Sequence, residues 1–292
     1  MSIVAKVREK SPISKWFTER NNPAVEGIIR QANQQLNNYP MSPKQSAHRG
    51  LIKAVAVYGF LKHLAYINSN SNWLNKTYAY KYLCKQTNCE ITDKPTETIH
   101  NEAIDCLINA ALDISYRNCR EHDFLNSFIQ SWKRKEEPSF NNKWHKEWEQ
   151  TISEAEEIIG NIARCWQTVN KNSYCSPIPN PTFELSGQIG GAQADIIVDN
   201  ILVSLVADTH LTKIKFQEAI AYLLLDSNNK YNLNQIAWLF PLRQTSIVIN
   251  VDKIFRDINN TRVQFKQIID ENYPSDEFDD EIDLFQYADK YC

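Results

Sequence analysis

The sequence predicts an α+β (or α/β) fold: a helical N-terminal region and a small mixed β-sheet core flanked by helices. Apolar residues recur at three- and four-residue steps before residue 170, which is the spacing of amphipathic helices. After the prolines of 177–181 the pattern changes to short β-branched runs, which is typical of strands. With 292 residues, 42% of them hydrophobic, the chain is long enough to bury a large core.

The first 175 residues are predicted to form the helical region. Residues 1–43 are polar and broken by prolines, so we expect an arm with one short helix. Helices are expected at about 44–66 and 99–118, and a third ends near Asn170. This third helix carries an apolar seam typical of packing against other helices, formed by Trp148, Ile152, Ala155, Ile159, Ile162 and Trp166.

The prolines at 177, 179 and 181 predict a stiff linker, followed by a core at 180–270. Asp199 and Asn200 separate two β-branched runs, and this pair in a two-residue turn predicts a hairpin. An acidic tail, 271–292, follows the core. The expected elements are strands at 196–198 and 201–207, a helix at 212–225, strands at 235–240 and 246–250, and a helix at about 252–270.

Cysteine usage and hydropathy bear on where the protein works. The seven cysteines have irregular spacing and no Cys-x-x-Cys pair, which favours reduced thiols over a disulfide framework. No stretch approaches the roughly 20 apolar residues that cross a bilayer, and the charged N-terminus does not resemble a signal peptide. We therefore expect a cytoplasmic protein without a membrane partner.

Charge is unevenly distributed along the chain. Residues 270–292 hold nine acidic residues against Lys290, a net charge of −8, so residues 1–269 carry +5 of the overall −3. A mildly basic body is compatible with a polyanionic partner. The tail also contains apolar residues, which suggests docking on a protein partner or on the basic body, although a disordered end is the simpler alternative. These apolar residues are Phe278, Ile282, Leu284, Phe285 and Tyr287.

Basic and aromatic residues alternate around 132–146, where Trp132 and Trp144 stand among lysines and arginine. Aromatic rings stack on unpaired bases and cationic side chains meet phosphates, so this stretch is a candidate nucleic-acid surface. Ordinary amphipathic packing with a solvated charged face is the alternative. The candidate nucleic-acid-binding residues are Lys133, Arg134, Lys135, Lys143 and Lys146.

Three of the seven glycines, Gly187, Gly190 and Gly191, lie within five residues and predict a tight bend. The bend leads into Ala194-Asp-Ile-Ile-Val198, a tight turn, an apolar strand, a lysine-bearing loop, a helix and a strand. This order, over residues 182–255, resembles the core of the PD-(D/E)XK nuclease superfamily, RecB-like members above all. The resemblance implies a restriction-endonuclease-like core.

In that family an Asp on one strand and an Asp or Glu on the next hold Mg²⁺, and a Lys follows two residues later. Magnesium prefers such oxygen ligands and activates water for phosphate hydrolysis. Carried over, the first Asp is Asp195, the second acidic position is Ser204 and the Lys position is Val206. On the helix, Glu218 stands where a Gln is usual, and Tyr222 keeps the family's Tyr. The catalytic pair itself is therefore replaced.

Relocated groups are the alternative. Asp208 or Glu218 would supply the missing carboxylate, and Lys213 or Lys215 the missing cation, with Asp195 as the metal ligand.

Three functions follow as expectations. The first is a degenerate nuclease-like protein, without cofactor, that binds nucleic acid or serves in a nucleic-acid-processing or defence complex. The second is an active Mg²⁺-dependent endo- or exodeoxyribonuclease that uses Asp195, Asp208, Glu218 and Lys213. The third is a helical protein-interaction module. Whether the chain is an enzyme stays open, and the loss at Ser204 and Val206 favours a protein that does not cleave.

Overall fold

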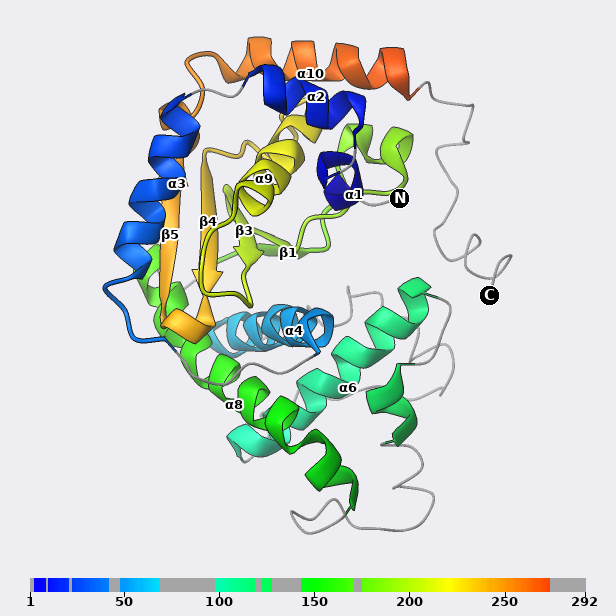
Figure 1. Cartoon of the computed structure of the whole chain (residues 1–292), viewed down its shortest axis with the longest axis vertical. Helices are drawn as coiled ribbons and strands as arrows, with labels where there is room; N and C mark the ends of the chain where they lie inside the picture. The colour runs from blue at the N-terminus through cyan, green and yellow to red at the C-terminus, as the bar shows by residue number, and fades with distance from the viewer. Residues whose placement is uncertain are drawn as a thin grey trace. The chain divides into compact units, whose positions relative to one another are not determined.

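The computed structural model divides the chain into two compact units (Figure 1). The first comprises Met1–Pro40, Cys175–Leu239 and Thr245–Ile282, and the second comprises Met41–Tyr174, Phe240–Gln244 and Asp283–Cys292. The structure describes residues 3–8, 10–20, 23–41, 48–68, 98–118, 122–127, 143–170 and 175–273.

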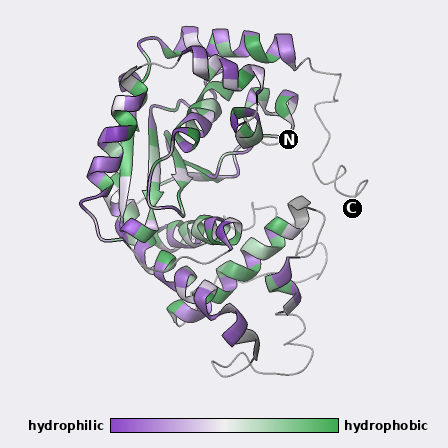
Figure 2. Cartoon of the chain, in the orientation of Figure 1, coloured by the Kyte–Doolittle hydropathy of each residue, from purple (hydrophilic) through white to green (hydrophobic). Residues whose placement is uncertain are grey.

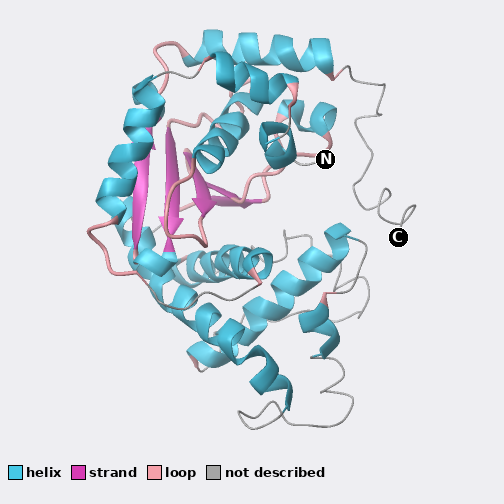
Figure 3. Ribbon diagram, viewed as in Figure 1, coloured by secondary structure: helices cyan, strands magenta, loops and turns pink. Residues whose placement is uncertain are grey.

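The first unit contains a five-stranded open sheet in the order β1-β2-β3-β4-β5. Strand β2 runs antiparallel to both β1 and β3, whereas β3 and β4 are parallel. The sheet is therefore mixed, and with the helices around it (Figure 3) the predicted α+β fold is confirmed. The strands are β1 (Pro177–Pro179), β2 (Ile196–Val198), β3 (Ile201–Leu205), β4 (Gln235–Phe240) and β5 (Thr245–Asn250).

The hairpin of β2 and β3 forms where the sequence predicts it, with Asp199 and Asn200 in the turn. Asp199 adopts a positive φ of 54°, a conformation that Asp tolerates better than most residues. Its carboxylate also accepts a hydrogen bond from the Ser176 backbone N–H at 2.9 Å. Asp199 therefore has a local structural role in the turn.

Strand β1 occupies the stretch that the sequence predicts to be a stiff linker. Pro177 and Pro179 pair with Val198 and Ile196 at the edge of the sheet. Proline has no N–H to donate, so it is tolerated at an edge and discourages pairing with another chain. The prolines thus mark the border of the sheet.

The crossover from β3 to the parallel strand β4 runs through helix α9 (Lys213–Leu225). The rings of Phe216 on α9 and Trp238 on β4 stack with centroids 5.5 Å apart. Every β4 residue after Gln235 is buried, as expected of a strand inside a sheet. The strands are coloured hydrophobic along most of their length (Figure 2).

Strand β5 returns beside β4, and the start of β4 faces the end of β5. The Gln235 amide donates to the Asn250 side chain at 3.0 Å, and the Val251 N–H donates to the Asn234 carbonyl at 2.9 Å. This pairing of opposite ends, with only four residues between the strands, makes the pair antiparallel.

The sequence predicts that the N-terminal residues form an arm with one short helix, and this prediction is wrong. They form three helices, α1 (Ile3–Arg8), α2 (Pro12–Glu19) and α3 (Pro23–Leu36), which group with the sheet. Helix α2 starts at a capping box formed by Ser11 and Ser14. Helices α1 and α3 contact α9, and α2 contacts α10 (Ile258–Asn272). The buried apolar residues of α1 and α2 are Ile3, Val7, Ile13, Trp16 and Phe17.

The second unit is built on helices α4 (Arg49–Ile67), α6 (Ile99–Asn118) and α8 (Lys143–Val169), which pack against one another. Gly59 allows a close approach of α4 to α8, because a Cβ there would lie 2.9 Å from Ile162 Cδ1. The predicted seam of α8 is largely buried. Its buried members are Trp148, Ile152, Ala155, Ile162 and Trp166.

Helix α4 is long and apolar enough to cross a membrane by length and composition alone. It is one such helix among the described residues, and half of its most apolar stretch is buried. Contacts with α6 and α8 account for this burial, as in the core helix of a globular unit. A single helix of this kind is weak evidence for a membrane span.

Candidate functional site

The β2–β3 hairpin places Asp195 beside Ser204. Ile196 pairs with Val203 in the ladder, so the residue before Ile196 lies opposite the residue after Val203. The Asp195 Oδ2 atom lies 3.4 Å from the Ser204 hydroxyl, which donates to it. Both side chains are half-buried. The two strand positions at which the PD-(D/E)XK family carries its carboxylates are therefore neighbours here, with an acid at one and a hydroxyl at the other.

The Asp195 carboxylate also binds the backbone of β3. Its Oδ2 atom accepts a hydrogen bond from the Leu205 N–H at 3.0 Å. This bond lies just past the last ladder pair of β2 and β3, where a backbone carbonyl would otherwise accept. Asp195 thus ends the ladder with its side chain, a structural role that does not depend on metal.

Val206, at the position of the family's Lys, is buried with an exposed fraction of 1%. Its backbone N–H donates to the Leu239 carbonyl at 2.9 Å and continues the parallel pairing with β4. An isopropyl side chain neither orients water nor stabilises negative charge. The residue therefore contributes to packing, and the position that the resemblance aligns with the family's Lys is apolar.

The loop between β3 and α9 holds the residues proposed as replacements. Asp208 forms an ion pair with Lys215, one turn into α9. The hydroxyl of Thr212 caps the start of this helix by accepting from the Lys215 N–H at 3.3 Å. The Lys213 Nζ atom lies 3.9 Å from the Glu26 Oε1 atom of α3. Each of these two lysines therefore has an acidic partner other than Asp195.

Helix α9 carries Glu218 and Tyr222 one turn apart, so both project from the same side of the helix. Both are half-buried. The Tyr222 ring lies 5.9 Å from the Phe183 ring, between centroids. Phe183 precedes the glycine bend, in which Gly190 and Gly191 adopt φ values of 86° and 79°. Tyr222 therefore packs against the segment that leads into β2.

Asn33 of α3 is a further residue at this loop, and no motif in the sequence points to it. Its side chain accepts from the Leu211 N–H at 2.9 Å and donates to the Leu211 carbonyl at 3.0 Å. The amide thus pairs with one backbone residue as a neighbouring strand would, and it fixes the end of the loop. The two residues are 178 positions apart, and no local pattern indicates their contact.

These residues do not fit a magnesium site with two carboxylates. Within the described part of the chain, no group of three or more His, Cys, Asp or Glu side chains lies close enough to hold a metal ion. Asp195 is beside a serine, and Asp208 is paired with a lysine. Magnesium usually binds through carboxylates with near-ideal octahedral geometry. The arrangement offers one carboxylate with one oxygen already bound to protein donors.

Most of the candidate nucleic-acid-binding residues lie at or beyond the limits of the described structure. Lys133, Arg134 and Lys135 are outside the described residues. Lys143 begins α8, and Lys146 is exposed one turn later. The exposed residues beside Lys146 include two acids, Glu147 and Glu149, so this turn of α8 carries both signs of charge.

The predicted acidic tail, 271–292, also lies largely beyond these limits. Its residues from 274 onwards are outside the described residues, whereas α10 extends to Asn272.

Comparison with known proteins adds no relative to this description. The chain matches no protein-family model, and it has no significant match among curated proteins or solved structures.

Proposed function

We propose that the chain is a PD-(D/E)XK-like protein that binds nucleic acid without cleaving it, alone or as a subunit of a nucleic-acid-processing or defence complex. The observation that carries the proposal is the juxtaposition of Asp195 and Ser204 across the β2–β3 hairpin. Chain order adds support, because the hairpin is followed by a helix and a strand, as the resemblance implies.

The chemistry of the site favours binding over cleavage. Metal-assisted hydrolysis needs an ion that is held firmly and that activates water. Ser204 supplies a neutral hydroxyl in place of a charged ligand, and Val206 supplies no cation. A protein that keeps such a scaffold without its chemistry retains a surface for the phosphate backbone.

The cleavage test uses the whole chain with single- and double-stranded DNA and RNA in Mg²⁺ and in Mn²⁺. We expect no metal-dependent product. Cleavage that Asp195→Ala abolishes would overturn the proposal in favour of an active nuclease with relocated residues. Asp199→Asn is the matched control, because it removes a carboxylate from the turn of the same hairpin and keeps a residue that accepts hydrogen bonds and tolerates a positive φ.

The binding test measures fluorescence anisotropy of labelled oligonucleotides over a salt series. The logarithm of the binding constant should fall linearly with the logarithm of the salt concentration, with a slope of about −0.9 for each phosphate contacted on duplex DNA. Replacing the basic residues of 132–146 with Gln should reduce both affinity and slope. Lys15→Gln is the control, since this exposed lysine pairs with Glu19 elsewhere in the chain. No binding at low salt by the unmodified chain would leave the helical interaction module as the better reading.

We also infer a reducing, cytoplasmic location. Cys106, Cys165 and Cys175 are buried free thiols. Burial raises the pKa of both Cys106 and Cys165 to about 12. These thiols stay protonated at neutral pH and are inert as nucleophiles. Mass spectrometry of alkylated protein from cells would test the location, and recovery of disulfide-linked cysteines would contradict it.

A further inference from the structure

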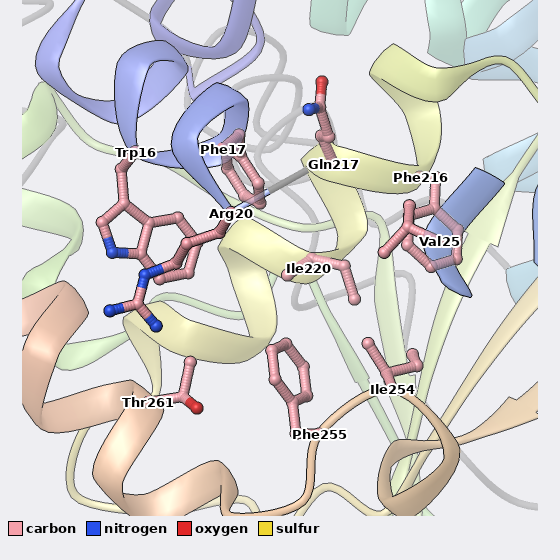
Figure 4. Close-up of a pocket in the computed structure, with 10 residues that line it drawn as sticks. All are labelled: Trp16, Phe17, Arg20, Val25, Phe216, Gln217, Ile220, Ile254, Phe255 and Thr261. Carbon is pink, nitrogen blue, oxygen red and sulfur yellow. The ribbon is translucent and has the colours of Figure 1, made fainter. Parts of the chain in front are cut away.

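A pocket of about 180 Å³ opens in the first unit among helices α2, α3, α9 and α10 (Figure 4). Figure 4 shows aromatic rings on several sides of it and the Arg20 side chain beside the Trp16 ring. Its lining is mainly aromatic and aliphatic, with three polar side chains. The lining residues are Trp16, Phe17, Arg20, Val25, Phe216, Gln217, Ile220, Ile254, Phe255 and Thr261.

This pocket is separate from the Asp195 site. Successive helix residues are 100° apart, so Phe216 and Ile220 project from one side of α9. Glu218 and Tyr222 project from roughly the opposite side. The pocket therefore faces α2 and α3, and its function is independent of the function proposed above.

The size of the pocket limits what it holds. An apolar cavity of about 150 Å³ is large enough to bind benzene, and this pocket, at about 180 Å³, is slightly larger. It therefore has room for one ring system. The rings of Phe17, Phe216 and Phe255 and the indole of Trp16 line it. Flat apolar walls of this kind favour a planar aromatic group.

The charge at the pocket comes from Arg20, which is exposed at the end of α2. Its guanidinium lies 4.9 Å from the Trp16 ring centroid and donates to the Gln264 side chain. These two contacts hold the guanidinium in one position. Arg20 has no ion pair with an acidic side chain in the described structure, so most of its five N–H donors are available to a ligand.

Trp16 contributes its indole ring to the wall of the pocket, and the whole residue is 7% exposed. Its Nε1 atom is buried and has no hydrogen-bond acceptor among the described residues, so this N–H does not donate to a molecule in the pocket. The N–H belongs to a ring of the wall, and its NMR signal therefore responds to a ligand that stacks there.

From these features we propose that the pocket binds a small planar aromatic anion. The ring lies among the aromatic side chains, and its carboxylate or phosphate meets the Arg20 guanidinium at the mouth. A guanidinium suits such groups because it can donate two parallel hydrogen bonds to their oxygens. Neutral aromatic molecules gain the apolar contacts without the charge-assisted hydrogen bonds and bind more weakly.

The experiment compares benzoate with benzamide, which has the same ring and no charge, and with cyclohexanecarboxylate, which has the charge and no planar ring. Binding is followed by NMR titration of the Trp16 indole N–H signal, assigned with a Trp16→Phe variant. We expect a saturable shift with benzoate, at a dissociation constant on the order of tenfold below that of either analogue.

Two variants and one control complete the test. Arg20→Gln should abolish the preference for benzoate over benzamide, and Val25→Phe should fill the pocket and remove binding of all three molecules. Arg30→Gln, an exposed arginine of α3 outside the pocket, should bind as the unmodified chain does. If Val25→Phe fails to fold, Arg20→Gln still decides the matter, because Arg20 is exposed and its loss leaves the core intact.

The proposal is overturned by any of three results: no saturable shift with benzoate, equal affinities for benzoate and benzamide, or an unchanged benzoate affinity in Arg20→Gln. If benzoate binds as expected, a titration with phenyl phosphate separates the two classes of anion. The tighter binding of benzoate or of phenyl phosphate identifies whether Arg20 prefers a carboxylate or a phosphate.

Discussion

At the scale of single residues, Ser204 and Asp195 are close enough to share a ligand. A carboxylate at 204 would lie within a few ångströms of the Asp195 Oδ2 atom, which is now 3.4 Å from the Ser204 hydroxyl. Two carboxylates at such a distance repel each other and are stabilised by a divalent cation. One substitution, a carboxylate in place of the Ser204 hydroxyl, therefore tests whether this pair of positions can bind a divalent cation.

We expect Ser204→Asp to create a divalent-cation site. Without metal, charge repulsion should destabilise the variant by about 1 kcal/mol or more. With Mn²⁺ at ten times its dissociation constant, the variant should regain about 1.4 kcal/mol, and the unmodified chain should not respond. Thermal denaturation with and without Mn²⁺ measures both effects. Ser204→Asn is the control, because Asn has the size of Asp without its charge. An identical change in thermal stability on adding Mn²⁺ in the Asn and Asp variants would refute the prediction.

A buried ion pair links the end of α9 to α10. Asp226 and Arg262 are 0% and 3% exposed, and their charged groups lie 3.8 Å apart. The Asp226 carboxylate accepts from the backbone N–H groups of Lys230 and Tyr231 at 3.0 and 3.3 Å. Arg262 donates to the Asn229 side chain at 2.8 Å. Desolvation raises the pKa of Asp226 despite these donors.

Arg262→Leu should destabilise the protein by about 3 kcal/mol at pH 7, because it leaves the Asp226 charge buried without its partner. A carboxyl with a raised folded pKa binds protons more tightly when folded. Stability should therefore increase as pH falls from the raised folded pKa of Asp226 towards its ordinary value of 3.8. Urea denaturation at pH 7 and pH 5 measures this, and the deficit of Arg262→Leu should shrink at pH 5. Arg256→Leu, at an exposed position, should cost little at either pH.

At the scale of elements, α3 holds the loop between β3 and α9 in place. The Asn33 side chain makes two hydrogen bonds with Leu211, and Glu26 on the same helix pairs with Lys213. Exposed ion pairs contribute little, so most of this attachment comes from Asn33. The position of Asp208 in that loop depends on a helix near the other end of the chain.

Asn33→Ala should destabilise the first unit by about 1–2 kcal/mol, since the Leu211 N–H and carbonyl lose their partners. Hydrogen exchange at the Leu211 amide should accelerate more than at β4 amides, because the opening is local. Gln34→Ala, at the next and exposed position of α3, is the matched control. Equal exchange rates at Leu211 in both variants would show that the two hydrogen bonds of Asn33 do not hold the loop.

At the scale of the whole molecule, the histidines of the helical unit make stability depend on pH. Desolvation lowers the pKa of His63, and desolvation followed by the neighbouring His48 lowers that of His122, which Asp123 partly opposes. A histidine with a lowered folded pKa resists protonation in the folded state. Its contribution is complete above the ordinary value of 6.5 and is lost as pH falls through the folded pKa.

The melting temperature should therefore fall when pH is lowered from 7.5 to about 5.5. A variant with His63→Gln and His122→Asn should show a smaller fall in melting temperature, because it lacks the two histidines whose folded pKa is lowered. Asn is chosen at position 122 because it keeps an acceptor for the Phe124 N–H, which His122 Nδ1 now binds at 3.2 Å. Calorimetry at several pH values measures the slope. His210→Gln is the control at an exposed position, and an unchanged slope in the double variant would contradict this origin.

The sequence by itself determined most of the elements. Strands β2 and β4 and helix α6 have the bounds that periodicity predicts, and the turn at Asp199 joins β2 to β3 as expected. These features depend on residues a few positions apart, whose spacing and backbone preferences act locally. The resemblance placed Asp195 and Ser204 on adjacent strands, and the register of the hairpin in the structure brings their side chains together.

Only the tertiary structure decided the rest. It assigned α1, α2 and α3 to the sheet unit, turned the proline stretch into the edge strand β1, joined Asn33 to Leu211, and brought Arg20 and Phe216 to one pocket. Each of these depends on contacts between residues far apart in the chain. Amphipathic spacing shows that a helix has an apolar face, but many partners satisfy the same hydrophobic requirement. Which partner a face meets is fixed by the packing of the whole unit.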